Sequence, residues 1–354
     1  MGAMQKTISS FKELKEKLEA NEAKVDIGFV EEAYTFAAKI HKGQKTPQGR
    51  KRIEHLLNTA NIISETILDE ETLAAALLHE SLFWGNVNKR DVERLFGKEV
   101  TKLVEQHKNE KRVEETNLES VDWELLSQIV LASAKDIRSI FIRIATSIDS
   151  LGGSEFLQSS EMKKRALIAL NVYAPICHKL GLMHYEMQLE DLAFKILYRE
   201  EYNQIKELVD EKIAQREKKV VAIRSEIERL MKKDGLDVFI QARAKHFYSI
   251  FKKLGRTQFG EIYDLLGTRV ICDSEADCYK ALGVINSKYS SLAHKFRDYI
   301  AEPKKNNYKS IHTVVLFGKQ PVELQIRTWK MHWDNEVGLA AHWQYKEFKK
   351  DKYF

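Results

Sequence analysis

The chain has 354 residues, of which 44% are hydrophobic and 31% are charged, and its formal net charge is +5. This length allows two or more domains with sizeable cores, and so mild a charge does not by itself indicate nucleic-acid binding. No apolar run in the sequence approaches the roughly 18 residues of a membrane-spanning helix. Cys177, Cys272 and Cys278 contain no close pair, so neither a disulfide framework nor a zinc site is indicated, and a reducing cytoplasm fits.

The first half of the chain repeats apolar side chains at every third or fourth position, which is typical of amphipathic helices. Helices are therefore predicted over residues 30–40, 53–67, 70–82, 89–95, 123–134 and 139–148. Breaks are predicted at residues 43–49, 84–88, 109–120 and 152–153. The charged segment 109–120 is predicted to be a mobile loop.

A second helical block is predicted over residues 161–233, and its last helix, which ends at Asp234-Gly235, is expected to connect two lobes. From residue 236 strands and helices alternate, which indicates an α/β lobe. Its expected elements are strands at 238–240 and 268–273, helices at 243–254 and from 331 to about 349, and a helix that begins at Ser274 with Asp277 in a capping box.

Residues 322–328 alternate strictly between apolar and polar side chains, which predicts a half-buried strand. Residues 311–317 form a similar run, so the two segments are predicted to pair as a hairpin. Glu323, Gln325 and Arg327 share the polar face of the second strand. A carboxylate, an amide and a guanidinium in one row suit a site for phosphates and a cation, although a solvated amphipathic strand has the same pattern.

Asp264 stands where a predicted helix end runs into the strand at 268–273. A sheet that brings Asp264 close to Glu323 would supply two carboxylates for Mg²⁺. This ion typically takes one or two protein carboxylates together with substrate phosphates and water. A magnesium site is therefore expected at this edge of the sheet.

Several short motifs follow one another along the second half of the chain. They are Arg243-Ala-Lys245-His246-Phe-Tyr248-Ser249, Tyr263-Asp264-Leu-Leu-Gly-Thr-Arg269, Arg297-Asp298-Tyr299, Pro303-Lys304 with Asn306, Tyr308 and His312, Glu323-Leu-Gln325-Ile-Arg327-Thr, and Ala340-Ala-His342-Trp343. In this order they resemble the long RelA/SpoT homologues, the bacterial stringent-response enzymes that make and degrade (p)ppGpp. The resemblance covers nearly the whole chain.

The resemblance implies an α+β multidomain fold. An all-α HD-type hydrolase domain is expected at residues 5–155, a helical connecting segment at 156–235, and an α/β nucleotidyltransferase-like synthetase domain with a mixed sheet at 236–354. The family's C-terminal regulatory domains, through which the ribosome and tRNA would act, are not expected in this chain, which resembles a cytoplasmic catalytic fragment. A homodimer is compatible with the family, and no membrane association is expected.

The family transfers pyrophosphate from ATP to the 3′-oxygen of GTP or GDP, and the resemblance assigns a role to each matching residue. Asp264 and Glu323 would hold Mg²⁺, and Glu323 would also be the base near the 3′-hydroxyl. ATP would be bound by Arg243, Lys245, Ser249, Lys252, Arg269 and Arg297. The acceptor nucleotide would be bound by Lys304, Asn306, Tyr308, His312, Gln325, Arg327 and Glu336, with Tyr308 stacked on guanine.

Two positions depart from the synthetase pattern. Asn307 stands where the family usually has Gly, and Lys309 stands where it has Gln. Asn tolerates the left-handed backbone that Gly supplies, so the turn is expected to survive. Lys309 adds a positive charge near the acceptor, which leaves the choice between GTP and GDP open.

The hydrolase half departs more from the family, which uses two histidines and two aspartates to hold Mn²⁺. His55 and His79 fit this pattern, but Glu80 replaces one aspartate and Thr146 the other, and Phe83-Trp84 replaces the Glu-Asp pair that positions water. A neutral hydroxyl and two aromatic rings cannot do what carboxylates do for a metal and its water. Asp149 is one helical turn beyond Thr146 and is a weak candidate for a shifted ligand.

The interpretation favoured by the sequence is a synthetase with an inactive hydrolase domain. The alternatives are a bifunctional enzyme whose metal site is rebuilt with Glu80 and Asp149, and a (p)ppGpp or RNA sensor without catalysis. A different nucleotidyltransferase fits less well, because it would not explain the HD-like half. The presence of both Asp264 and Glu323 argues against a sensor, which needs neither carboxylate.

Overall fold

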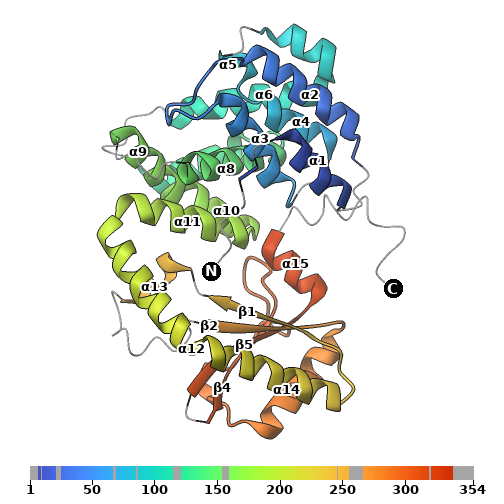
Figure 1. The fold of residues 1–354 in the computed structure, drawn as a ribbon, viewed down its shortest axis with the longest axis vertical. Helices are drawn as coiled ribbons and strands as arrows, with labels where there is room; N and C mark the ends of the chain where they lie inside the picture. The colour runs from blue at the N-terminus through green and yellow to red at the C-terminus, as the bar shows by residue number, and fades with distance from the viewer. Residues whose placement is uncertain are drawn as a thin grey trace. The chain divides into compact units, whose positions relative to one another are not determined.

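The computed structural model describes residues 7–8, 10–20, 25–66, 69–84, 87–114, 121–153, 159–244, 246–254, 266–318 and 320–337. At 109–114, 208–222, 242–244, 266–267, 320 and 337 it describes the backbone alone. The chain divides into two compact units. The described parts of Gln5–Cys177 and Gln188–Leu197 form the helical unit, and those of His178–Met187 and Tyr198–Leu339 form the sheet unit (Figure 1).

The helical unit is built around α3, α4 and α8, whose side chains are buried almost throughout. Aspartates at the helix starts satisfy the first amides; Asp69, for example, accepts a hydrogen bond of 2.8 Å from the Thr72 amide. The elements of this part of the chain are α1 (Phe11–Ala20), α2 (Ile27–Ile40), α3 (Arg52–Ile63), α4 (Glu70–Leu78), α5 (Ser81–Trp84), α6 (Lys89–Glu114), α7 (Trp123–Ser133), α8 (Ile137–Gly152), α9 (Ser160–Ile168), a π-helix (Ala169–Tyr173), α10 (Ala174–Leu180) and α11 (Met183–Leu197).

The prediction of a loop over 109–120 was wrong for its first part, because α6 continues to Glu114. Residues 110–114 are Glu, Lys, Arg, Val and Glu, most of which favour helix, so a polar composition alone did not indicate a loop here. Residues 115–120 lie outside the described part of the chain. The irregularity in α6 lies instead at Gly97, whose φ of 82° is accessible to glycine at little cost.

The sheet unit contains a five-stranded mixed sheet in the order β1-β2-β5-β4-β3. β2 and β5 run parallel, and the other neighbouring strands are antiparallel. Its elements are α12 (Arg199–Lys233), β1 (Phe239–Ala244), α13 (Phe247–Leu254), β2 (Leu266–Cys272), α14 (Glu275–Lys288), a 3-10 turn (Ala293–Lys295), β3 (Arg297–Asp298), β4 (Ile311–Phe317), β5 (Gln320–Thr328) and α15 (Trp329–Val337). The expected fold class, helices followed by an α/β part with a mixed sheet, is confirmed.

The predicted hairpin is confirmed: β4 and β5 pair antiparallel with Ile311 opposite Ile326. Ser274 is the N-cap of α14, because its hydroxyl accepts from the Asp277 amide, and the same hydroxyl donates to the Asp277 carboxylate. The predicted helix at 243–254 begins later, at Phe247, because residues 243 and 244 continue β1 and pair with β2. The last helix is described only as far as Val337.

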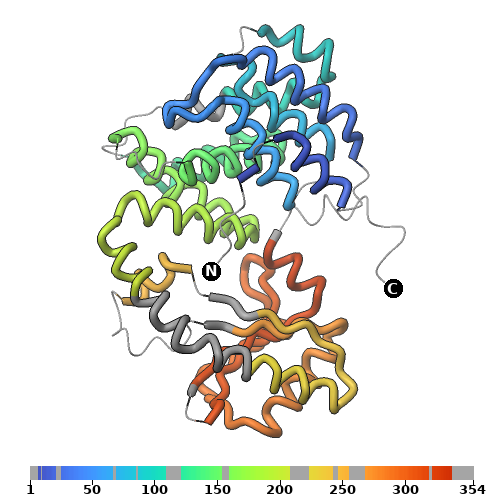
Figure 2. The backbone as a smooth tube through the Cα atoms, in the orientation of Figure 1, coloured from blue at the N-terminus to red at the C-terminus, as the bar shows by residue number. Residues whose placement is uncertain are grey.

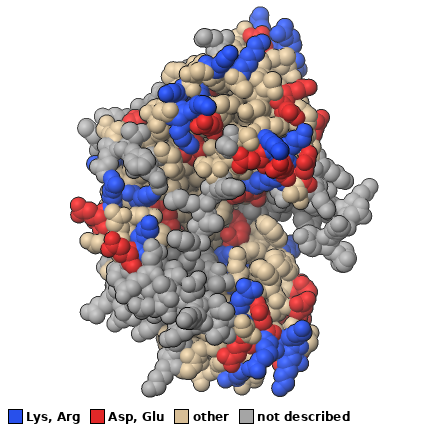
Figure 3. Space-filling view, in the orientation of Figure 1, with Lys and Arg blue, Asp and Glu red and all other residues tan. Residues whose placement is uncertain are grey.

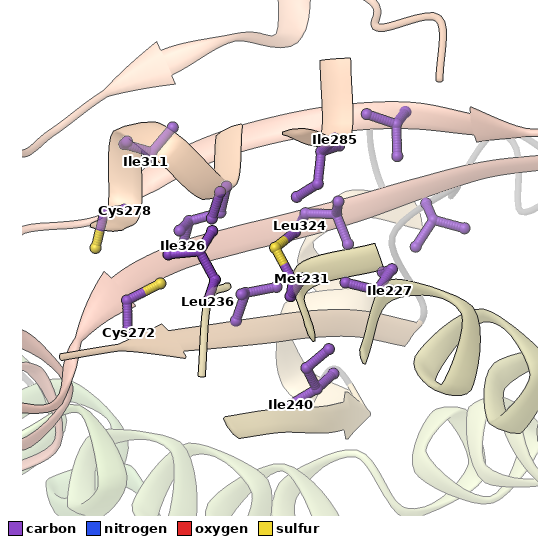
Figure 4. Packing of buried hydrophobic residues seen from close by; sticks show 14 of the residues in the cluster. Ile227, Met231, Leu236, Ile240, Cys272, Cys278, Ile285, Ile311, Leu324 and Ile326 are labelled. Carbon is purple, nitrogen blue, oxygen red and sulfur yellow. The ribbon is translucent and has the colours of Figure 1, made fainter. Parts of the chain in front are cut away.

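The long helix α12 belongs to the sheet unit from Arg199 onward (Figure 2), and its expected role of connecting two lobes stays a prediction. Its last turns supply Ile223, Ile227 and Met231 to the same core as α14 and the strands. Figure 4 shows Ile227 and Met231 beside Leu324 of β5. The apolar side of the hairpin is therefore covered by α12 and α14, which leaves the other side of the sheet for polar residues.

Lysine and arginine are interspersed with aspartate and glutamate over the described surface in Figure 3, as a small net charge would suggest. None of the helices in the described ranges is long and apolar enough to cross a membrane. The three cysteines are buried and carry free thiols.

Candidate functional site

A row of polar side chains crosses all five strands on the side of the sheet that faces away from α12 and α14. The strand register places Gln241, Arg269, Gln325, His312 and Arg297 opposite one another in turn. Four of these five residues are predicted nucleotide-binding residues, and they come from strands far apart in the sequence. The sheet thus brings predicted ATP-binding and acceptor-binding residues into one line.

Glu323 lies two residues before Gln325 on the same face of β5, with its side chain 22% exposed. In the neighbouring strand its partner is Gly267, three residues after Asp264, which itself lies outside the described residues. The Glu323 carboxylate is 3.5 Å from Nδ1 of His312. The expected pairing of Asp264 with Glu323 therefore stays a prediction, while Glu323 is a partly accessible carboxylate on the polar face.

His312 connects Glu323 to Tyr308. The Tyr308 hydroxyl lies 2.7 Å from Nε2 of His312 and accepts a hydrogen bond of 3.1 Å from the Arg327 guanidinium. A hydroxyl can accept two hydrogen bonds and donate one, so the direction of its contact with Nε2 follows the tautomer of His312. These contacts form a chain from the Arg327 guanidinium through Tyr308 and His312 to the Glu323 carboxylate.

Tyr308 is only 8% exposed, which is less than its predicted role as a stacking platform suggests. Its ring meets those of Tyr299 and His312 edge-on, and the Lys304 ammonium lies 4.9 Å from its centroid. Burial lowers the pKa of Lys304, and the nearby Glu323 carboxylate opposes this shift. Tyr308 is thus a packed aromatic as well as a candidate platform.

Arg327 was predicted on the polar face, and it is there, but it is 1% exposed. Its guanidinium donates to Gln325 and to the Tyr308 hydroxyl. Burial is the main cause that lowers the pKa of Arg327, although a guanidinium stays charged in proteins. Arg327 is therefore placed to fix its neighbours, and its contact with the acceptor nucleotide stays a prediction.

Arg269 of β2 and Glu336 of α15 form an ion pair, in which a guanidinium nitrogen lies 2.6 Å from a carboxylate oxygen. Arg269 is 6% exposed, and Gln241 accepts a second hydrogen bond from it. The sequence assigned Arg269 to ATP and Glu336 to the acceptor, so the structure brings together residues of the two predicted subsites. A phosphate at Arg269 would have to compete with this carboxylate.

The other predicted residues are more dispersed. The Ser249 hydroxyl is 2.9 Å from Nε2 of His246, and the Lys252 ammonium lies over the Tyr248 ring. Arg297 is exposed and donates to two nearby carbonyls. Lys245 lies outside the described residues, and only the backbone of Arg243, in β1, is described. A cleft of about 860 Å³ is lined in part by Arg297, Tyr299, Lys304 and Asn306.

Asn307 has a φ of 60°, so the expected left-handed turn is present without glycine. The amide of Asn306 caps this turn by accepting from the Tyr308 N–H at 3.3 Å. The sequence did not point to Asn335, which is 4% exposed and bonds both the N–H and the carbonyl of Lys309. This amide from α15 holds the loop that leads into β4.

The helical unit contains a second cluster, in which two arginines are bound to the two carboxylates. Arg52 is hydrogen-bonded to Glu80, and Arg50 binds Asp149 with contacts of 2.6 and 3.1 Å. Asp149 also accepts from Nδ1 of His55 at 2.5 Å. The weak candidate Asp149 therefore does reach this cluster, as the partner of a histidine and an arginine.

The donor set of this cluster resembles a metal site but does not fit one. His55, His79 and Glu80 have ligand atoms within 4.8 Å of one another, and Nδ1 of His79 donates to the Ala76 carbonyl. Both imidazoles therefore present Nε2, the tautomer a metal requires. Glu80, however, is neutralised by Arg52. A divalent cation at this position would meet a guanidinium instead of a free anionic ligand.

Thr146, Phe83 and Trp84 occupy the remaining positions of the predicted degenerate site. Thr146 is half-buried, and its hydroxyl donates to the Ile142 carbonyl at 2.7 Å. Trp84 is 50% exposed and lies against the Arg52 guanidinium, 5.0 Å from ring to cation. The Phe83 ring lies near the Lys108 ammonium. These groups supply neither a third anionic ligand nor a carboxylate for a water molecule.

Glu80 should make the helical unit sensitive to acid. Burial alone would raise its pKa, but electrostatic interactions with His55, His79 and Arg52, together with the hydrogen bond from Arg52, outweigh burial and lower the pKa from 4.5 to about 2. A carboxyl with a lowered folded-state pKa contributes stability above its unfolded pKa and loses it as the pH falls through the folded one. The contribution is about 3 kcal/mol, lost between pH 4.5 and pH 2.

Hydrogen exchange of the α3 and α4 amides at pH 6 and pH 3 measures this loss. Glu80→Gln cannot titrate, so its opening free energy should change less between the two pH values than that of the wild type. Equal changes in both proteins would show that Glu80 is not a source of the acid sensitivity.

Comparisons with known proteins agree with both halves. The family model described as a region found in RelA / SpoT proteins matches residues 242–350, and an HD-domain model matches residues 33–183. The chain is 38% identical over 322 residues to a GTP pyrophosphokinase of Streptomyces coelicolor, covering 90% of this chain and 38% of that protein. It is 36% identical over 319 residues to the bifunctional (p)ppGpp synthase/hydrolase SpoT of Escherichia coli, covering 89% and 45%.

The chain thus spans less than half the length of these relatives. Among solved structures, the small alarmone synthetase 1 of Bacillus subtilis bound to pppGpp matches with 22% identity and a TM-score of 0.31, over 38% of this chain and 81% of that one. So low a score carries no structural argument.

Proposed function

Because the chain belongs to the RelA/SpoT family, we propose that its sheet unit transfers pyrophosphate from ATP to the 3′-hydroxyl of GTP or GDP. The observation that carries this proposal is the polar row across the five strands, with the Glu323 carboxylate beside it. Phosphoryl-type transfer depends mostly on positioning and charge neutralisation. Arginines suit both tasks, because the guanidinium fork matches phosphate oxygens.

In the proposed reaction the 3′-oxygen bonds to the β-phosphorus of ATP, the bond from that phosphorus to the α,β-bridging oxygen breaks, and AMP leaves. Glu323 accepts the proton of the 3′-hydroxyl. His312, which contacts Tyr308 through Nε2, would keep the Glu323 carboxylate in place through Nδ1. Arg269 and Arg297 would neutralise phosphate charge, and Lys304 with Asn306 would line the acceptor subsite.

The family implies Mg²⁺ for this reaction, and a partly exposed carboxylate such as Glu323 is a donor that Mg²⁺ prefers. Glu323 and Asp264 would hold the ion. When bound, it would neutralise phosphate charge during the transfer.

We further propose that the helical unit does not hydrolyse (p)ppGpp and serves as a structural and regulatory partner of the sheet unit. Its two carboxylates are bound to arginines, Thr146 is neutral, and Phe83 and Trp84 cannot orient water as carboxylates do. Cytoplasmic location and control by ribosomes and tRNA through further domains belong to this proposal as well.

An assay with two arms tests both statements on the purified protein. One arm supplies labelled ATP with GTP or GDP and Mg²⁺, and the other supplies labelled ppGpp with Mn²⁺. We expect pppGpp or ppGpp in the first arm and no released pyrophosphate in the second. Comparison of GTP with GDP also decides the acceptor preference that Lys309 leaves open.

Two results would contradict the proposal. Pyrophosphate released in the second arm would mean that the enzyme is bifunctional, with Glu80 and Asp149 in a rearranged metal site. If the first arm stays empty although isothermal titration shows that ATP and GTP bind, the protein is a nucleotide sensor and not a synthetase.

A further inference from the structure

The cluster of Arg52, Glu80, His55 and His79 resembles a metal centre in which the guanidinium of Arg52 lies beside the donor residues in place of a metal ion. Two histidines present Nε2, and their Nδ1 atoms are fixed by Asp149 and by the Ala76 carbonyl. Such second contacts orient imidazoles in metal sites. The three donor residues are all buried, at 0 to 8% exposure, and gather within 4.8 Å.

Arg52 lies next to these three donor residues and is fixed there by several contacts. Besides its contact with Glu80, its guanidinium donates to the Lys45 carbonyl at 3.0 Å and lies under the Trp84 ring. Arg52 is itself 8% exposed, and it is the first residue of α3, the helix that also contributes His55. The guanidinium is therefore a built-in part of the cluster rather than a mobile surface group.

A buried carboxylate needs a compensating charge. In a His-His-Glu site a divalent cation supplies it; here the guanidinium does. We propose that Arg52 replaces the metal ion of this site, and that removing Arg52 frees a His55–His79–Glu80 donor set that binds a divalent transition metal. This deepens the proposal that the helical unit does not hydrolyse (p)ppGpp, and rests on it, but it is read out by metal binding rather than by catalysis.

Arg50 offers a matched control within the same cluster. Its partner Asp149 lies behind His55, bonded to Nδ1, and is not one of the three donors. Removing Arg50 takes away the same type of side chain a short distance along the chain, without freeing Glu80. If the role of Arg52 is specific, Arg52→Met should acquire a metal site and Arg50→Met should not.

Co²⁺ titration followed by visible absorption and by calorimetry tests this. We expect the wild type and Arg50→Met to show no ligand-field bands, and Arg52→Met to bind one Co²⁺ at least tenfold more tightly than either. Arg52→Met/His79→Ala should lose the bands again. Equal binding by the wild type and Arg52→Met, a gain in both single variants, or no gain in a folded Arg52→Met would each overturn the inference.

A second measurement keeps the test decisive if Arg52→Met does not fold. Thermal unfolding of the wild type should be unchanged by EDTA or by about 1 mM Mn²⁺. This Mn²⁺ concentration is far above the dissociation constant of any tight site, so a bound metal would raise the unfolding temperature. A metal-dependent rise of several degrees that His79→Ala abolishes would overturn the inference. Metal binding without hydrolysis would leave the proposed function standing, and hydrolysis by a metal-free wild type would contradict the proposed function alone.

Discussion

Glu323→Gln should abolish synthesis of pppGpp and ppGpp while leaving the protein folded. The amide has the shape of the carboxylate and can still contact Nδ1 of His312, which lies 3.5 Å from the carboxylate in the wild type. The neutral amide cannot take a proton from the 3′-hydroxyl, and it lacks the negative charge with which a carboxylate binds a cation. General-base catalysis contributes about 10²- to 10⁴-fold, so the initial rate should fall by at least about 100-fold.

The measurement is the initial rate with saturating ATP and GTP, together with the affinity for GTP by calorimetry. The rate should collapse while the GTP affinity changes little. Glu275→Gln is a suitable control, because Glu275 is an exposed carboxylate in the first turn of α14, in the same unit. If Glu323→Gln keeps more than a third of the wild-type rate, Glu323 is neither the base nor an essential metal ligand.

The elements that the sequence predicted best are those whose local pattern and packing agree. The hairpin was found because Val322, Leu324 and Ile326 alternate with polar residues, and the same three side chains are buried under α12 and α14. The helix predicted to begin at residue 243 begins later, because Arg243 and Ala244 pair with β2 as part of β1. Such pairing depends on a strand more than twenty residues away, which no local pattern shows.

The candidate site was predictable as a set of residues but not as a set of contacts. Short motifs pointed to Tyr308, His312 and Gln325, yet not to the hydrogen bonds that join Tyr308 to Arg327 and His312. The substitution of Glu80 was visible in the sequence. Its neutralisation by Arg52 was not, because the pairing depends on how α3 packs in three dimensions against the turn between α4 and α5.

Tyr308 has two possible roles, as a stacking platform for guanine and as a hydrogen-bonding bridge, and the sequence did not distinguish them. As a platform, the ring would stack on the guanine of the acceptor, which is worth about 1–3 kcal/mol. As a bridge, the hydroxyl accepts from the buried Arg327 and shares a hydrogen bond with Nε2 of His312. Removing one partner of such a buried contact costs about 1–3 kcal/mol. The ring and the hydroxyl can be removed separately.

Tyr308→Phe should therefore lower kcat about tenfold with little change in the KM for GTP, because Arg327 and His312 lose their bridge while the ring remains. Tyr308→Ala should also raise that KM at least tenfold, so that kcat/KM falls about 100-fold or more. Tyr279→Phe is the matched control. It also removes a tyrosine hydroxyl that donates a hydrogen bond, here to Asp298, but Tyr279 is 40% exposed.

Steady-state kinetics with GTP as the varied substrate distinguish the roles, with thermal unfolding as the check on folding. A Tyr308→Phe variant with wild-type kcat would show that the hydroxyl bridge does not support Glu323, and would leave stacking as the role of Tyr308. A Tyr308→Ala variant with unchanged KM would show the reverse. In that case the ring is a core aromatic, as its burial suggests, and the guanine must be recognised by the exposed Lys304 and its neighbours in the cleft.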